Sequence, residues 1–212
     1  MPPEPADVVD HLLGVRPGDR LDRVRAARPE ARANAQKAYE ALFRPVDDSE
    51  MSVVERLAVA TFVVGLHAAE DLHEFYATRL AAALGDGADA VGQGGSAVVR
   101  AVGEETARAR GTGPYGVYRE RGLAAESQPR TAFEAADAAV LGGRLAGALE
   151  HAQLLVLRPR EATPEMLGQL LAHGWSTAGI VTLSQLVAFL AFQVRVVHGL
   201  RQLAAVDTEG TR

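Results

Sequence analysis

Cysteine is missing from this chain of 212 residues. Its absence excludes disulfide bonds, a thiol nucleophile, a cysteine-ligated zinc or iron–sulfur site, and any thiol redox couple belonging to the chain itself. The length predicts about one domain. A chain of this size buries roughly 70% of the surface that it exposes when unfolded, so a substantial core is expected.

Lysine is almost missing as well. Lys37 is the only lysine among 22 basic residues, and the formal net charge is −5. An acidic chain with scattered arginines is a poor candidate for binding nucleic acid, and a single lysine argues against Schiff-base and phosphate-loop chemistry. The arginines between Arg20 and Arg32 alternate with acidic residues, which indicates a solvated helix face. No nucleic-acid partner and no cofactor are expected.

Aromatic residues are few, at 5%, whereas alanine is abundant. This composition favours close-packed helices over sheets, so the predicted fold class is all-α. Capping residues, helical spacing of apolar residues, and Gly or Pro stops mark the expected helices. They are 8–13, 19–43 with a kink or a break at Pro29, 53–84 as one helix or two abutting ones, 96–109, 133–156, 164–173 and 177–205.

Three parts are expected along the chain. Residues 1–50 form an N-terminal helical arm, residues 51–205 a helical domain, and residues 206–212 a disordered tail. Within the domain, residues 85–135 are an irregular insertion around one short helix, because glycines and prolines cluster there.

The last expected helix, 177–205, is apolar on almost every side. It still holds more polar residues than an isolated membrane span tolerates, namely Ser184, Gln185, Gln193, Arg195 and His198. A helix without a wet face is buried by its own domain or by a neighbouring subunit, so we expect a homo-oligomer built on this helix. The N-terminus is rich in proline and acid, unlike a secretory signal. A soluble, cytoplasmic protein with no membrane partner is predicted.

Two segments resemble a known family. Residues 55–80, ERLAVATFVVGLHAAEDLHEFYATRL, resemble the signature helices of the carboxymuconolactone decarboxylase-like, or alkylhydroperoxidase D-like, superfamily. Residues 163–200 are similar to the closing helices of its peroxidase-related branch: a helix, Gly174, the small cap Ser176, and a long apolar helix with an Ala-Phe-x-x-Phe sequence. Together the two segments cover roughly half of the chain. The resemblance implies an oligomeric, all-α bundle of the alkylhydroperoxidase D-like type.

The resemblance also locates the family's redox site. Thiol peroxidases of the family carry Cys-x-x-Cys at the start of a helix, a histidine four residues later and a glutamate twelve residues before, and a helix N-terminus with a nearby base lowers the thiol pKa. The two cysteine positions correspond to Ala69 and Leu72, the histidine position to Tyr76, and the glutamate position to Leu57. None of these side chains can perform the relay, so thiol peroxidase activity is not expected.

Polar residues remain near the altered site. On a continuous helix His67, Glu70 and His73 would share one broad face, where they could act as acid and base or bind a divalent metal. The alternative is that they are polar surface residues.

Further along the chain, Tyr115 and Tyr118 could line a pocket, or their rings could lie on the core.

Three histidines later in the chain stand apart from this group. His151 and His173 are expected at helix ends or on the surface. His198 and the nearby Arg195 lie in an apolar helix, so they are expected to meet an acidic group across a subunit interface.

Three functions remain open. The first is an oligomeric or regulatory paralogue without peroxidase activity of its own, which could assemble with a cysteine-bearing homologue. The second is a non-thiol enzyme of the same fold that acts on a small organic acid or lactone. The third is a module that binds a small ligand between its helices.

Overall fold

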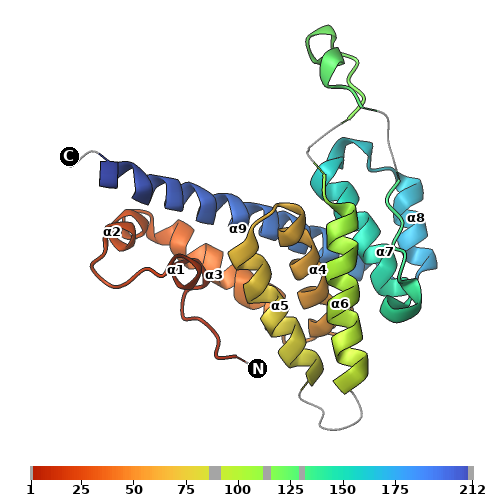
Figure 1. Cartoon of the computed structure of the whole chain (residues 1–212), viewed down its shortest axis with the longest axis horizontal. Helices are drawn as coiled ribbons and strands as arrows, with labels where there is room; N and C mark the ends of the chain where they lie inside the picture. The colour runs from red at the N-terminus through yellow and green to blue at the C-terminus, as the bar shows by residue number, and fades with distance from the viewer. Residues whose placement is uncertain (1, 86–91, 112–115, 129–131, 210–212) are drawn as a thin grey trace.

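The computed structural model describes residues 2–85, 92–111, 116–128 and 132–209 (Figure 1). Apart from one isolated bridge between Gly116 and Ser127, the regular structure of these residues is helical, which confirms the all-α prediction. The α-helices are α1 (Val8–Leu13), α2 (Arg20–Ala26), α3 (Pro29–Phe43), α4 (Val53–Leu66), α5 (Glu70–Gly85), α6 (Gly92–Ala109), α7 (Ala138–Leu157), α8 (Pro164–Ala172) and α9 (Thr177–Glu209). There are also two short 3-10 helices: η1 (Arg121–Glu126) precedes α7 in the sequence, and η2 (Pro159–Glu161) follows it.

Helix α4 is the centre of the bundle. It begins at the predicted capping box, in which the Ser52 hydroxyl accepts from the backbone N–H of Glu55 and the Glu55 carboxylate accepts from the backbone N–H of Ser52. Every residue from Arg56 to Leu66 is buried. Helices α3, α5, α6, α7 and α9 all pack against α4. The apolar sequence of α4 is therefore explained by burial on all sides.

The stretch predicted as one or two helices is two. Helix α4 ends at Leu66, and α5 begins at Glu70 after a turn in which Ala68 has φ 52°. This left-handed conformation is uncommon for a residue with a side chain, and it redirects the chain between the helices. Residues 67–69 therefore do not continue the helical faces of α4.

The sequence predicted either a kink or a break at Pro29, and the structure has a break: α2 ends at Ala26 and α3 begins at Pro29. Pro29 is the first residue of α3, where its missing N–H costs no hydrogen bond.

The arginines of this region are not simply solvated. Arg25 is buried and pairs with Asp7 at 2.7 Å, and Arg32 pairs with Asp22 at 2.9 Å. Both arginines also bind Asp10, so these ion pairs tie α1 to α2 and α3.

The N-terminal arm belongs to the main core. Helices α1, α2 and α3 all contact α9, and α3 also contacts α4. Tyr39 and Phe43 of α3 stack with Phe75 and Tyr76 of α5, with ring centroids 5.0–6.4 Å apart. Residues 1–50 thus share one hydrophobic core with the rest of the chain.

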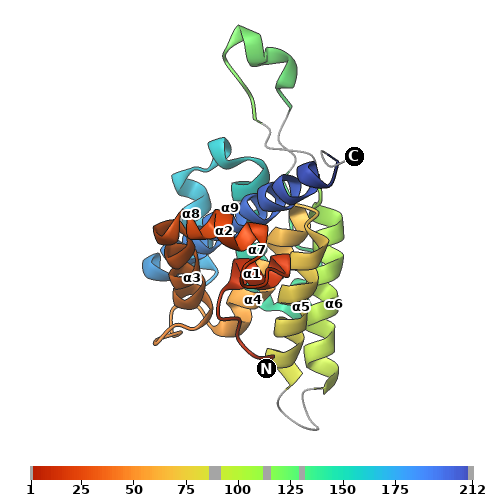
Figure 2. The same ribbon diagram turned by 90° about the vertical axis from the view of Figure 1, so that its left-hand side faces the viewer.

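The predicted insertion, residues 85–135, is only partly irregular. Helix α6 starts at Gly92, four residues earlier than expected, and its Ala101 and Val102 are completely buried against α4 and α5. Residues 116–128 stand out from the bundle, as Figures 1 and 2 show from two directions. The helix that was expected to begin at Phe133 begins at Ala138 as α7. Residues 132–137, which precede it, are not helical and lie along α6 and α7.

Helix α9 crosses the whole bundle. Its two halves lie beside different elements, α7 and α8 at one end and α1 to α3 at the other (Figure 1). The helix continues to Glu209, past the predicted end at residue 205, and residues 210–212 of the expected tail lie outside the described residues. By length and composition Thr177–Val206 could also cross a membrane. Among the described residues it packs against six other helices, and the absence of a membrane partner and the cytoplasmic location stay predictions.

Candidate functional site

The positions that the resemblance assigns to the redox site are part of the packed core. Leu57, Leu72 and Tyr76 are at most 1% exposed, and Ala69 is half-buried. The Tyr76 hydroxyl donates to Oε1 of Gln193 on α9 at 2.7 Å, and burial raises the pKa of Tyr76 well above its ordinary value. Tyr76 is therefore a neutral hydrogen-bond donor rather than a base.

The structure does not bring His67, Glu70 and His73 onto one helix face. His67 caps the C-terminal end of α4, whereas Glu70 opens α5 and forms an ion pair with Arg110 at 3.0 Å. The ring of His73 lies against Gly65. The expectation of a shared face was wrong because the turn at Ala68 interrupts the helix. In the part of the chain that the structure describes, no three His, Asp or Glu residues form a metal site.

His67 instead borders a pocket between α4, α7 and α9. The pocket has a volume of about 330 Å³, and its walls include Leu155, Val187 and Arg195. Burial, and to a smaller extent the charge of Arg195, lower the pKa of His67. One of the predicted acid–base residues therefore lies at a cavity, but without the two partners that were predicted for it.

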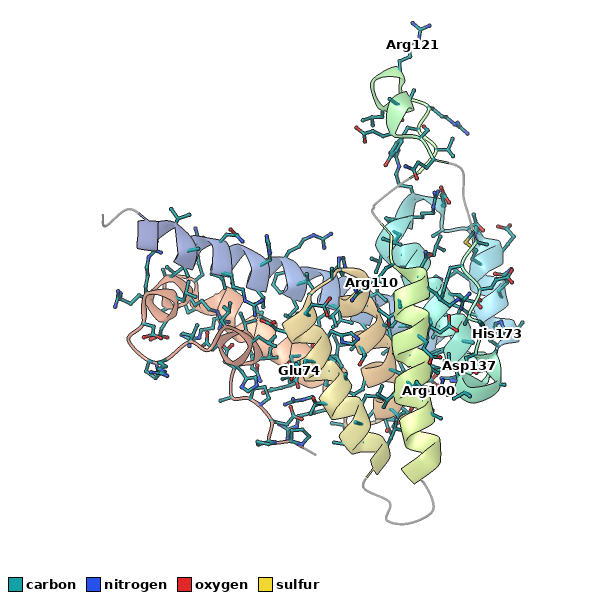
Figure 3. The ribbon with its side chains drawn as sticks, viewed as in Figure 1. Glu74, Arg100, Arg110, Arg121, Asp137 and His173 are labelled. Atoms are coloured by element: carbon teal, nitrogen blue, oxygen red, sulfur yellow. The ribbon has the colours of Figure 1, made fainter. Side chains whose placement is uncertain are left out.

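A second, more polar pocket lies between α7 and α8. It has a volume of about 430 Å³, and Glu150, His151 and His173 are among the side chains around it. His151 is buried in the middle of α7, not at a helix end or on the surface as predicted, and burial lowers its pKa. His173 caps the C-terminal end of α8 and is exposed, as expected (Figure 3).

Glycine explains how His173 reaches this pocket. A Cβ atom at Gly147 would lie 2.9 Å from Cδ2 of His173, so a side chain here would push the imidazole away from α7. The sequence signal for the contact is the pair of glycines at 143 and 147, four residues apart on α7, which lets α8 approach closely. This signal was not used in predicting the site.

A third pocket is an apolar groove between α9 and the N-terminal helices. It has a volume of about 530 Å³, and Val24 and Ala35 face Phe192 and Leu203 across it. Phe192 and Leu203 are 47% and 39% exposed, and further large apolar side chains are exposed elsewhere on α9, at Val181 and Val206. Helix α9 therefore has an exposed apolar face within a single chain.

Tyr118 and His198 line none of these three pockets, whereas Arg195 lines two of them. Tyr115 lies outside the described residues, and the ring of Tyr118 faces the guanidinium of Arg160 at 5.0 Å without lining any of the three pockets. Arg121 points away from the bundle at the tip of the excursion (Figure 3). His198 and Arg195 are exposed, so the acidic partner expected across a subunit interface stays a prediction.

In comparisons with known proteins, no family model, no curated protein and no solved structure matches this chain. The family resemblance therefore stays a prediction, and the argument for function depends on the residues themselves.

Proposed function

We propose that this protein is a thiol-free helical subunit that works by self-association through the C-terminal half of α9 and has no peroxidase activity of its own. The observation that carries the proposal is the exposed apolar face of α9. Four large apolar side chains of this helix are between 39% and 67% exposed within the chain, namely Val181, Phe192, Leu203 and Val206. Exposed apolar surface of this kind favours association, because covering it removes it from water.

The C-terminal half of α9 is the better docking surface. Phe192 and Leu203 project beside a groove whose other wall includes the apolar side chains of Val24 and Ala35 and also Arg25, Arg28 and Arg32. Helix α9 of a second copy can insert its exposed apolar side chains into this groove, and the groove of the second copy can receive the same side chains of the first. Such a self-complementary contact is the usual basis of two-fold dimers.

Size measurement tests this association. In sedimentation velocity at micromolar concentration, the wild-type protein should have at least twice the mass of one chain. Leu203→Asp should weaken association by at least about tenfold, because it would bury a carboxylate in the apolar contact. Val46→Asp is the matched control, since Val46 is fully exposed on a turn before α4.

Two outcomes would count against the proposal. A wild-type protein that stays monomeric would contradict it, and so would a Leu203→Asp variant that associates as well as Val46→Asp. If the wild-type chain is monomeric alone but forms a complex with a cysteine-bearing homologue, the partner is that homologue and self-association is wrong.

The absence of thiol chemistry has its own test. With a hydroperoxide and a dithiol reductant, the purified protein should consume no more peroxide than the buffer does, because it has no sulfur nucleophile that can form a disulfide. A catalytic rate that scales with protein concentration would contradict this prediction.

A further inference from the structure

The imidazole of His67 has a polar atom without a partner. Its Nε2 is enclosed by protein and forms no hydrogen bond with any described residue. The next residue, Ala68, has a left-handed backbone with φ 52°. An unpaired buried nitrogen costs stability and recurs at ligand sites, whereas the left-handed Ala68 is a usual way to end a helix, with its N–H donating to the Gly65 carbonyl oxygen. The two features lie next to each other in the turn between α4 and α5.

Arg195 is a second group with unused hydrogen-bonding capacity. Its Nη1 donates to the carbonyl oxygen of Ala191 at 2.8 Å, one turn earlier on α9. Among the described residues no carboxylate pairs with this guanidinium. Burial first, and then the positive charge of Arg195, lower the pKa of His67. His67 is therefore neutral at pH 7, and Arg195 is the charged group at this pocket.

The walls of the pocket are mainly apolar. Leu155 and Val156 of α7 face Val187 and Ala188 of α9 across a volume of about 330 Å³. The hydroxyl of Ser184 donates to the Ile180 carbonyl oxygen at 2.9 Å, so its proton is already used. None of the described residues that line the pocket is acidic. Helices α4, α7 and α9, which supply most of these residues, pack against one another in the bundle (Figure 1).

We infer that this pocket binds a small apolar monocarboxylic acid, with Arg195 as the charge partner of the carboxylate and His67, whose ring must turn to bring the enclosed Nε2 to the pocket, as a hydrogen-bond donor. A guanidinium pairs with a carboxylate through two parallel hydrogen bonds, and a neutral imidazole supplies one N–H. The apolar walls fit a hydrocarbon or aromatic body. A second carboxylate would lie against Leu155 and Val156 without a partner, which disfavours dicarboxylic acids.

This inference goes beyond self-association and can fail separately from it. Arg195 borders both the pocket and the groove of the proposed docking surface, whereas Leu203 borders the groove and not the pocket. A Leu203→Asp variant should therefore bind the acid as the wild-type protein does.

Benzoate is a suitable probe, with benzyl alcohol as its uncharged counterpart. Titration of the full-length, isotope-labelled protein should give saturable shifts of the His67 ring signals with benzoate and none with benzyl alcohol. The bound carboxylate should also raise the pKa of His67, measured from the same signals. Arg195→Gln should weaken benzoate binding at least about tenfold. Arg121→Gln, which removes the same charge from the tip of the excursion, should leave it unchanged.

A variant of the histidine gives an independent readout. His67→Gln keeps a hydrogen-bond donor and should retain part of the affinity, whereas His67→Phe should lose it. The inference is overturned if benzoate does not saturate, if benzyl alcohol binds equally well, or if Arg195→Gln and Arg121→Gln weaken binding to the same extent.

Discussion

At the scale of single residues, two histidines, His151 buried and His67 half-buried, link the stability of this protein to pH. Burial lowers the pKa of His151, and burial together with the charge of Arg195 lowers that of His67. In the unfolded chain both imidazoles take up a proton near pH 6.5, whereas in the folded chain they take it up only at lower pH. Their contribution to stability is therefore complete above about pH 6.5 and is lost as pH falls through the folded pKa values.

We predict that the free energy of unfolding decreases as the pH is lowered from 7.5 towards 5, by up to about 1.4 kcal/mol per pH unit for each neutral histidine. In His151→Gln this decrease should be smaller, because one of the two groups is gone. Urea unfolding at several pH values measures it. His198→Gln, on the exposed side of α9, is the control and should keep the wild-type slope. An unchanged slope in His151→Gln would contradict the prediction.

Residue identities could predict part of the candidate site. Leu57, Leu72 and Tyr76 are unable to perform thiol relay chemistry, and their apolar character also predicts their burial in the core. His151 could not be placed from the sequence, because α7 is apolar on several sides and its spacing does not identify the side facing α8. Its burial depends on a helix that follows later in the chain.

At the scale of elements, a close contact between α4 and α6 depends on one glycine. A Cβ atom at Gly65 would lie 2.4 Å from Cγ2 of Thr106 and 3.0 Å from Cδ2 of His73. Both neighbours come from elements that pack on α4, so the extra atom cannot be accommodated without separating them. Gly103 on α6 has no such neighbour within 4 Å.

We predict that Gly65→Ala lowers the free energy of unfolding by about 1–3 kcal/mol through overpacking. Gly103→Ala should raise it by about 0.5–1 kcal/mol, because alanine is the better helix former and nothing obstructs its methyl group. Thermal unfolding of the two variants compares the same substitution in two environments. Equal effects of the two substitutions would show that the contact between α4 and α6 is not tight.

Local chemistry predicts where several elements begin. Ser52 and Glu55 start α4, and Pro29 and Pro164 start α3 and α8, because capping bonds and the missing proline N–H act within one turn of helix. The break at residues 67–69 has no such signal, since it contains neither glycine nor proline. The position of this break is decided by the packing of α5 and α6 on α4. The residues that make this packing are spread along the chain, so no local sequence pattern marks the break.

At the scale of the whole molecule, one core joins segments that the sequence suggested were separate. The N-terminal helices and α6 pack on the same central helices as the rest of the chain. Helix α9 links these parts, yet part of its apolar surface remains exposed. An apolar helix was predictable from its composition, but the residues that stay exposed depend on how α1 to α3 and α7 cover it. This exposed face is the basis of the proposed self-association.

Cysteine labelling tests the proposed face most directly, because the chain has no cysteine of its own. In Leu203→Cys the thiol should react with a maleimide more slowly as the protein concentration rises, since association covers it. In Val117→Cys, whose position on the excursion is 70% exposed, the rate should stay constant. If both thiols react at rates that do not depend on concentration, α9 is not an interface and the account of this protein as a self-associating subunit is wrong.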